Sequence, residues 1–221
     1  MGLKTVCWAM GGALLLMAVA LGDEGTKAKP NQGTPAWQRM LQGDDAKKAK
    51  KLLGQIDEWI TAKKWADAAR VAEELAAFRE AKQGKEHWQA VSARFEVAAI
   101  EKVQAAPEQK RNAYAENLAV RKQAAQMEAK GKHAAAEPMR RKLLDLRRDV
   151  LGEEHPHTAR SYNNLAMNQN AQGRYKEAEQ GYRTALAICR KVHGENHPDT
   201  ATSYNNVADR KSTRLNSSHS S

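Results

Sequence analysis

The sequence repeats itself at a fixed spacing of 42 residues. His155-Pro156 and His197-Pro198 are 42 residues apart, and the residues around them stay in register. The two segments read GEEHPHTARSYNNLA at 152–166 and GENHPDTATSYNNVA at 194–208, with 11 of 15 positions identical. A period in this range is typical of solenoids, in which each unit buries its apolar face on its neighbours. The period therefore predicts an array of similar units rather than one compact core.

The full unit between the two copies has the pattern of a helix pair. Apolar residues recur at helical spacing on both sides of Gly173, which interrupts the pattern as a turn. Pro156 and Pro198 fit the first turn of a helix, where a missing N–H is tolerated. The first stripe consists of Tyr162, Leu165, Ala166 and Gln169, and the second of Tyr175, Ala178, Tyr182, Ala185, Leu186 and Cys189.

On these residues the unit resembles a tetratricopeptide repeat of the long, kinesin-light-chain type. The resemblance implies an all-α fold, a right-handed superhelical solenoid of antiparallel helix pairs. It indicates the architecture strongly and a particular biochemical role only weakly. The matching positions are Leu165-Ala166, Gly173, Tyr175, Ala178, Tyr182 and Ala185, together with the Gly-x-x-His-Pro link.

An imperfect copy of the unit begins near Lys47. In this copy Lys63 stands where the later unit has its turn glycine, and Trp88 stands where it has proline. The interval from Gly84 to Gly152 is 68 residues, which exceeds one period by 26 and predicts an additional helix. We expect helices at about 52–60, 65–76, 88–105, 108–130, 136–146, 162–169 and 175–189, with the repeat domain spanning 47–208.

The N-terminal segment has the pattern of an export signal. Lys4 precedes an apolar, uncharged run at 6–21, and Ala18-Val19-Ala20 supplies a cleavage motif. We predict a signal peptide at 1–22, an exported protein (periplasmic or secreted), and a flexible linker at 23–46. The alternative is an uncleaved membrane anchor through residues 6–22.

The C-terminal segment departs from the repeat. Residues 209–219 match one translation frame of a common DNA sequencing adapter, so residues 209–221 are predicted to be a non-native tail. This interpretation implies that the natural chain continues beyond Ala208. The missing part leaves an alternative function open, because the repeats could regulate a larger enzyme with a caspase-like peptidase or kinase module.

The sequence carries a net positive charge, and its basic and acidic residues are interleaved. The formal net charge is +10, and about +7 remains for the repeat region when the signal segment and tail are set aside. Basic clusters at 47–51 and 140–148 could face phosphates, yet acidic residues alternate with them on most helices. We therefore expect solvated faces and no nucleic-acid partner.

No catalytic or cofactor motif is found in the sequence. Phosphate-binding, nucleophile-elbow and zinc-protease motifs are absent. His155, His157, His193 and His197 lie in the links between units and lack the carboxylate or cysteine spacing of a metal site. Cys189 lies on the apolar stripe and is expected to be a buried hydrophobe. The sequence predicts no enzyme, no cofactor and no metal.

The polar side of one predicted helix indicates a ligand-binding surface. Arg160, Asn163, Met167 and Asn170 recur at helical spacing on the side of their helix opposite the apolar stripe, and Thr202 and Asn205 are equivalents one unit later. The resemblance places first helices along a concave groove, so these six residues are the predicted peptide-binding site. A carboxamide can both donate to and accept from a peptide backbone. For Asn163 and Asn205, hydrogen bonding between neighbouring units is an equally weighted alternative, and Asn164 and Asn206 are expected to be structural.

Together these patterns predict an exported protein–protein interaction scaffold that binds a peptide or partner protein in the groove of the array. A membrane contact is expected only if the N-terminal segment stays uncleaved. The identity of the ligand, the oligomeric state and the number of further repeats do not follow from the sequence.

Overall fold

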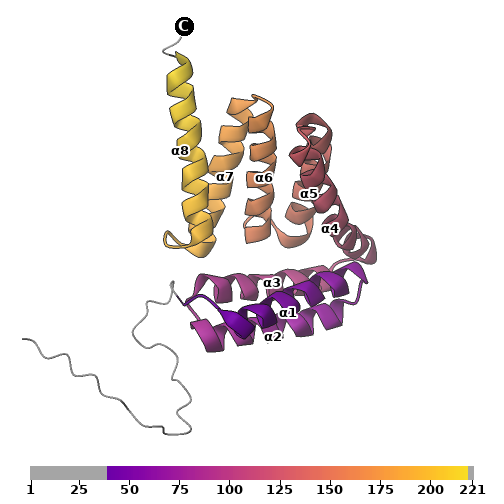
Figure 1. The fold of residues 1–221 in the computed structure, drawn as a ribbon. Helices are drawn as coiled ribbons and strands as arrows, with labels where there is room; N and C mark the ends of the chain where they lie inside the picture. Colours follow the sequence, from indigo (N-terminus) through magenta and orange to yellow (C-terminus); the bar gives the residue numbers. More distant parts are fainter. Residues whose placement is uncertain (1–38, 219–221) are drawn as a thin grey trace, which may run out of the picture. The chain divides into compact units, whose positions relative to one another are not determined.

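The structure, a computed structural model, describes residues 39–218, with side chains up to Asp209. These residues form eight helices and no strand. The helices are α1 (Gly43–Thr61), α2 (Trp65–Gln83), α3 (Trp88–Ala105), α4 (Glu108–Ala129), α5 (His133–Leu151), α6 (Pro156–Ala171), α7 (Tyr175–His193) and α8 (Pro198–Ser218). The predicted all-α fold of consecutively packed helices is confirmed (Figure 1).

The predicted boundaries differ from the observed helices at both ends. α1 begins at Gly43, within the segment assigned to the linker, and α8 continues past Ala208 to Ser218. The signal segment at 1–22 and most of the linker lie outside the described residues. The non-native origin of the tail stays a prediction. Among the described helices, none is long and apolar enough to cross a membrane.

The tight turns inside the helix pairs require a left-handed backbone. Gly131 and Gly173 have φ values of 73° and 76°, and Lys63 takes the same conformation with φ 60°. Lys63 stands in the first copy where the later unit has glycine, and it forms the same left-handed turn as the glycines. A side chain is tolerated there at a steric cost that glycine avoids.

Helix packing follows the chain order except at one point. Neighbouring helices pack extensively from α1 to α3 and again from α4 to α8, whereas α3 and α4 share only a small contact around the turn at Ala106–Pro107. The additional helix predicted from the spacing is therefore present, but α3 and α4 do not form a regular antiparallel pair. In their place, α4 also contacts α1, and α5 also contacts α3.

The hydrophobic core is continuous across this irregular junction. A cluster of buried side chains from α1, α2 and α3 also includes Tyr114 of α4 and Leu151 of α5. Smaller clusters fill the later pairs, such as Ala166, Ala178 and Tyr182 between α6 and α7. Tyr162, expected on a buried stripe, is only partly buried, because its hydroxyl extends to the Glu153 carboxylate.

α6 and α7 approach each other closely at Gly181. A Cβ atom on Gly181 would come within 2.9 Å of the Cβ of Ala166, which is fully buried. Glycine is therefore required at this position by packing, because its φ is not in the left-handed region. The contact positions α6, which carries most of the predicted ligand face.

Candidate functional site: a polar face on α6 and α8 and an arginine pocket

The six predicted ligand residues are found on α6 and α8, but they do not form one continuous site. Arg160 and Met167 are exposed on α6, and Thr202 and Asn205 are exposed on α8. Asn163 and Asn170 are half-buried. The helical spacing thus identified a face that is mostly accessible, although Asn163 and Asn170 are half-buried.

Asn163 is already engaged by the next repeat. Asn206 Nδ2 donates a 2.6 Å hydrogen bond to Asn163 Oδ1, and Asn163 Nδ2 lies 3.5 Å from the Met167 sulfur. The structure therefore shows for Asn163 the inter-unit hydrogen bond that was one of its two predicted roles. It also gives Asn206 its expected structural contact. The Asn205 side chain makes no hydrogen bond with any described residue.

Met167 and Asn170 line a cavity of about 290 Å³ together with Tyr182, Asn206 and Asp209. The Oδ1 atom of Asn170 is buried there without a hydrogen-bond partner. Thr202 serves its own helix, since its hydroxyl donates to the Pro198 carbonyl oxygen at 2.9 Å. The predicted face therefore contains one small polar cavity and, elsewhere, exposed side chains.

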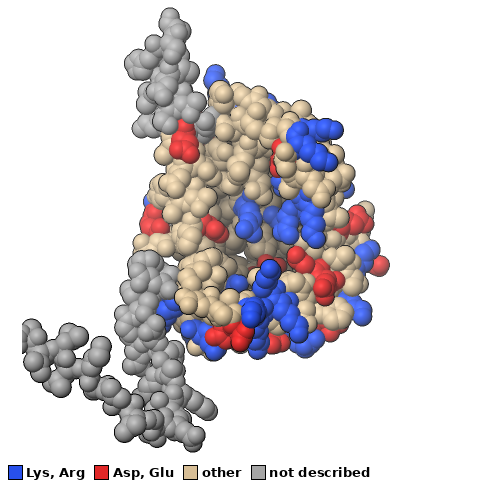
Figure 2. Space-filling view, viewed as in Figure 1, with Lys and Arg blue, Asp and Glu red and all other residues tan. Residues whose placement is uncertain are grey.

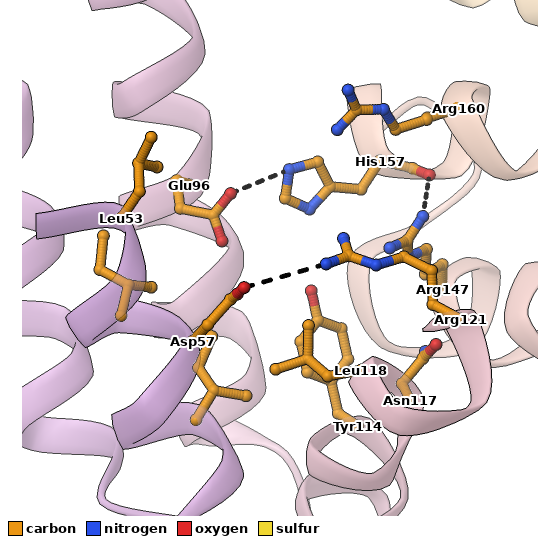
Figure 3. A pocket seen from close by; sticks show the side chains of 12 residues that line it. Leu53, Asp57, Glu96, Tyr114, Asn117, Leu118, Arg121, Arg147, His157 and Arg160 are labelled. Carbon is orange, nitrogen blue, oxygen red and sulfur yellow. Dashed lines mark hydrogen bonds and ion pairs between the residues drawn. The ribbon is translucent and has the colours of Figure 1, made fainter. Parts of the chain in front are cut away.

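Arg160 belongs to a second and more enclosed cavity, at the junction where α3 and α4 fail to pair. This cavity, here called the arginine pocket, has a volume of about 290 Å³ and is lined by side chains from α1, α3, α4, α5 and α6 (Figure 3). Its lining residues are Leu53, Ile56, Asp57, Ile60, Glu96, Tyr114, Asn117, Leu118, Arg121, Arg147, His157 and Arg160. In the space-filling view, Lys and Arg side chains gather on both sides of a hollow in this face (Figure 2).

The carboxylates of the arginine pocket each have a partner. Glu96 lies 3.2 Å from His157 Nε2, and Asp57 lies 4.0 Å from Arg121 (Figure 3). Burial acts to raise the pKa of Glu96, but His157 first, and then Arg147 and His155, overcome it and lower the pKa to about 2. Glu96 is therefore ionised at any physiological pH.

Two guanidinium groups of the pocket have no carboxylate partner among the described residues. Arg147 is only 8% exposed, and its Nη1 donates to the His157 carbonyl oxygen at 3.0 Å and to Ser161 Oγ at 2.9 Å. Its Nε is buried without a partner, and burial lowers its pKa. Arg160 makes no ion pair. Glu96 offsets part of the Arg147 charge electrostatically, but three arginines against two carboxylates leave the lining with a net positive charge, which favours an anion in the pocket.

Asn117 supplies a second unsatisfied group. This residue is 6% exposed, and both its Nδ2 and its Oδ1 are buried without a hydrogen-bond partner. An unpaired buried carboxamide destabilises a protein by about 1–3 kcal/mol for each unsatisfied group. Asn117 lines the cavity, so a rotation of its side chain would let a ligand complete these hydrogen bonds.

Of the arginine pocket, the sequence predicted only Arg160 as a ligand residue; it also noted Arg147 within a basic cluster and His157 within a link, without assigning either a site. The other polar lining residues, such as Glu96, Asn117 and Arg147, come from three different helices and share no local spacing. The 26-residue excess between two glycines was the one signal that an irregular junction lies here. It located the extra helix but could not say which side chains meet.

The histidines of the inter-unit links act as helix caps. The Nδ1 atoms of His87, His155 and His197 each accept a 3.1 Å hydrogen bond from the backbone N–H two residues later, at the starts of α3, α6 and α8. The recurring Gly-x-x-His spacing was the signal for this role, since it places a histidine before each of these helices. Capping satisfies one of the free N–H groups of the first turn.

His193, His197 and Asp199 are the described residues whose ligand atoms come within metal-binding range of one another. The imidazole rings of His193 and His197 are stacked, with centroids 3.9 Å apart and planes 8° from parallel. The lone pairs of two stacked, parallel rings cannot point at one ion. In addition, His197 Nδ1 is occupied by the cap of α8. The observed geometry is that of packed rings, and it does not fit a bound metal.

Cys189 is buried, as the apolar stripe predicted. The thiol is 5% exposed, and burial raises its pKa, which keeps it protonated. The Ser203 hydroxyl lies 3.7 Å from the sulfur. A buried, protonated thiol of this kind behaves as a small apolar side chain.

The fold and its faces define a class of helical-repeat proteins built from stacked helix pairs. Comparison with protein families finds a match over part of the chain: residues 128–157 and 158–199 match the tetratricopeptide repeat. Residues 128–199 are thus similar to tetratricopeptide repeats, as the 42-residue unit indicated. Among curated proteins no match was found.

Proposed function

We propose that this chain is an exported scaffold that binds a peptide or a partner protein along α6 and α8. Tetratricopeptide repeats generally mediate protein–protein interactions. A typical role of the all-helical repeat fold is that of a non-catalytic scaffold. The arrangement of consecutive helix pairs favours the same role, because a solenoid presents an extended surface of similar side chains.

The observation that carries this proposal is the accessible face of the repeats. Met167 is 53% exposed although it is a large apolar residue, and Arg160 on α6 and Asn205 on α8 are also exposed. Accessible methionine and arginine side chains are enriched at protein interfaces. Asn163 contributes by holding α8 against α6 through Asn206.

The binding face can be tested with matched variants. The purified chain is used to capture proteins from the exported fraction of its host, and Arg160→Ala and Met167→Ala are compared with Tyr175→Ala. Tyr175 is a suitable control because it lies on α7 and is also 53% exposed. We expect at least one captured protein to be lost with the two α6 variants and retained by the α7 variant. Identical capture by all three variants would contradict a binding face on α6.

Export is a separate part of the proposal, supported by the apolar segment at 6–21 and the Ala18-Val19-Ala20 motif. Mass spectrometry of the protein recovered from its host measures the mature N-terminus. A first residue at 21 or 23 supports cleavage and export. Recovery of the intact segment in the membrane fraction supports the anchored alternative.

A further inference from the structure

We propose that the arginine pocket binds a carboxylate that carries a single negative charge on a short apolar body. The pocket lies at the irregular junction of α3 and α4, with α1, α5 and α6 completing its walls. The inference concerns a different cavity from the peptide face of α6 and α8, shares only Arg160 with that face, and is tested with a small probe.

The charge balance of the pocket favours a monoanion. Three arginines face two carboxylates, and Asp57 and Glu96 are paired with Arg121 and His157. One carboxylate on the ligand would balance the remaining charge and could accept hydrogen bonds from Arg147 and Arg160. Guanidinium groups bind planar carboxylates especially well, since two parallel N–H groups match two oxygens.

Asn117 specifies a second polar group on the ligand. With Nδ2 and Oδ1 both unpaired, this side chain offers one donor and one acceptor at the same point. An amide next to the carboxylate presents the complementary pair. This feature distinguishes the expected ligand from a simple inorganic anion, which would leave Asn117 Nδ2 or Oδ1 unsatisfied.

The remaining wall is apolar and the space is small. Leu53, Ile56, Ile60 and Leu118 line the cavity beside the charged groups, as Figure 3 shows for the labelled Leu53 and Leu118. A volume of about 290 Å³ is at the lower end for small-molecule sites. An aliphatic body of a few carbon atoms would pack against this wall.

A dianion such as phosphate suits the pocket less well. Glu96 is ionised and lies within the lining, and Asp57 is opposite Arg121, so a second negative charge on the ligand would face both carboxylates. Like charges in a partly enclosed space repel strongly. The chemistry therefore indicates an amide-bearing monocarboxylate, which could be a free acylated amino acid or the C-terminal residue of a peptide.

N-acetyl-leucine is a probe with these groups, and N-acetyl-leucinamide is its matched control without the charge. Isothermal titration of the full chain should show saturable binding of the acid and at least about tenfold weaker binding of the amide. A short peptide ending in leucine separates the two sources. Tight binding of the peptide indicates a chain terminus, and binding of the free acid alone indicates a small metabolite; either result supports the proposed site.

Two variants connect the binding to the pocket. Arg160→Gln should weaken N-acetyl-leucine binding about tenfold, whereas Arg70→Gln on α2, an exposed arginine outside the pocket, should not. Asn117→Leu should weaken binding while raising the melting temperature of the empty chain, because it replaces an unsatisfied buried carboxamide with an apolar group of similar size. A residue with a purely structural role would not change these two properties in opposite directions.

Several outcomes would overturn the inference. Equal binding of the acid and its amide would show that no carboxylate is recognised. Equal stabilisation by inorganic phosphate would show a non-selective basic surface. A lower melting temperature for empty Asn117→Leu would show that the carboxamide has a structural partner, and absence of binding up to about 10 mM acid would show that the pocket has no such ligand.

Discussion

The carboxamides of Asn163 and Asn206, 43 residues apart in the chain, are joined by a 2.6 Å hydrogen bond between α6 and α8. The first residue was a candidate ligand contact, and the second was expected to be structural. The Asn163 oxygen and the Asn206 amide group are therefore engaged with each other in this arrangement and not with a peptide backbone. Asn205, the repeat equivalent of Asn163, remains exposed.

We expect Asn163→Ala to lower the free energy of unfolding by about 0.5–1.5 kcal/mol, because it leaves the half-buried Asn206 amide without its partner. Asn205→Ala should change it by less than about 0.5 kcal/mol, as is usual at exposed positions. Urea unfolding followed by circular dichroism measures both. Equal stability of the two variants would mean that the hydrogen bond contributes nothing.

Two glycine-to-alanine changes should act in opposite directions. At Gly181 the new Cβ would lie 2.9 Å from the Ala166 Cβ, so overpacking should cost about 1–3 kcal/mol and exceed the gain in helix propensity. At Gly54 of α1 no atom lies within 4 Å of the added Cβ, and the change should stabilise by about 0.5–1 kcal/mol. Melting temperatures should separate the two variants. A stabilised Gly181→Ala would show that α6 and α7 can move apart at no cost.

The turn at Lys63 should be improved by glycine. A non-glycine residue in the left-handed region costs about 1–2 kcal/mol, part of which is offset by the larger chain entropy of unfolded glycine. We expect Lys63→Gly to stabilise the chain by about 0.5–1 kcal/mol. The opposite change at the equivalent turn, Gly173→Ala, should destabilise it by about 1 kcal/mol for the same reason. A loss of stability with Lys63→Gly would show that the lysine side chain itself holds the turn.

Acid should destabilise the repeats well above the pH at which carboxylates titrate. Burial lowers the pKa of His155 to about 3 and that of His193 to about 4. Between pH 6.5 and 4 the unfolded chain binds protons at these sites and the folded chain does not, so stability falls as the pH falls. Protonation of His155 Nδ1 would also remove the cap of α6. Below about pH 4.5 Glu96 and Glu137, both with pKa lowered to about 2, add a change of the same sign.

Urea midpoints between pH 7.5 and 4 measure this dependence, with the fall beginning near pH 6.5. The charged and titratable groups around the two histidines are His157, Lys102, Glu96 and Arg147 for His155, and His197, Asp199 and His157 for His193. His155→Asn retains a capping side chain without a group that titrates in this range, and it should make the curve flatter. A midpoint that is constant down to pH 4.5 would contradict the burial of these rings.

The sequence predicted the fold well where the structure is local. Glycines at turns and the apolar stripe within each helix predict where the helices end. These ends lie near Gly131, Gly152, Gly173 and Gly194. Lys63 was correctly aligned with the turn glycines because the period fixed its register. Local spacing and a fixed period are sufficient when each unit packs only on its neighbours.

The candidate site was predictable only in part, since its geometry depends on contacts between distant helices. Helical spacing placed Arg160 and Met167 on an exposed face, but it could not show that Arg160 also borders a cavity shared with Leu53 and Asn117. Nor could it distinguish a ligand contact from a neighbour contact at Asn163. Both questions depend on the arrangement of α1, α4 and α6, which is determined by how the chain turns at Pro107.

That turn changes how stability is distributed along the array. In a regular solenoid each helix depends on the two beside it, so unfolding from one end can proceed unit by unit. Here α1 contacts α4 and α3 contacts α5, which links early helices to later ones across the weak α3–α4 step. The stabilities of α1, α3, α4 and α5 therefore depend on one another at the junction. Loss of α5 would weaken α3 as well as its own neighbours. Phe95 of α3 also contacts His193 of α7, and Trp88 contacts His197 at the start of α8, so the last helices are linked to the same block and the array should unfold cooperatively rather than unit by unit.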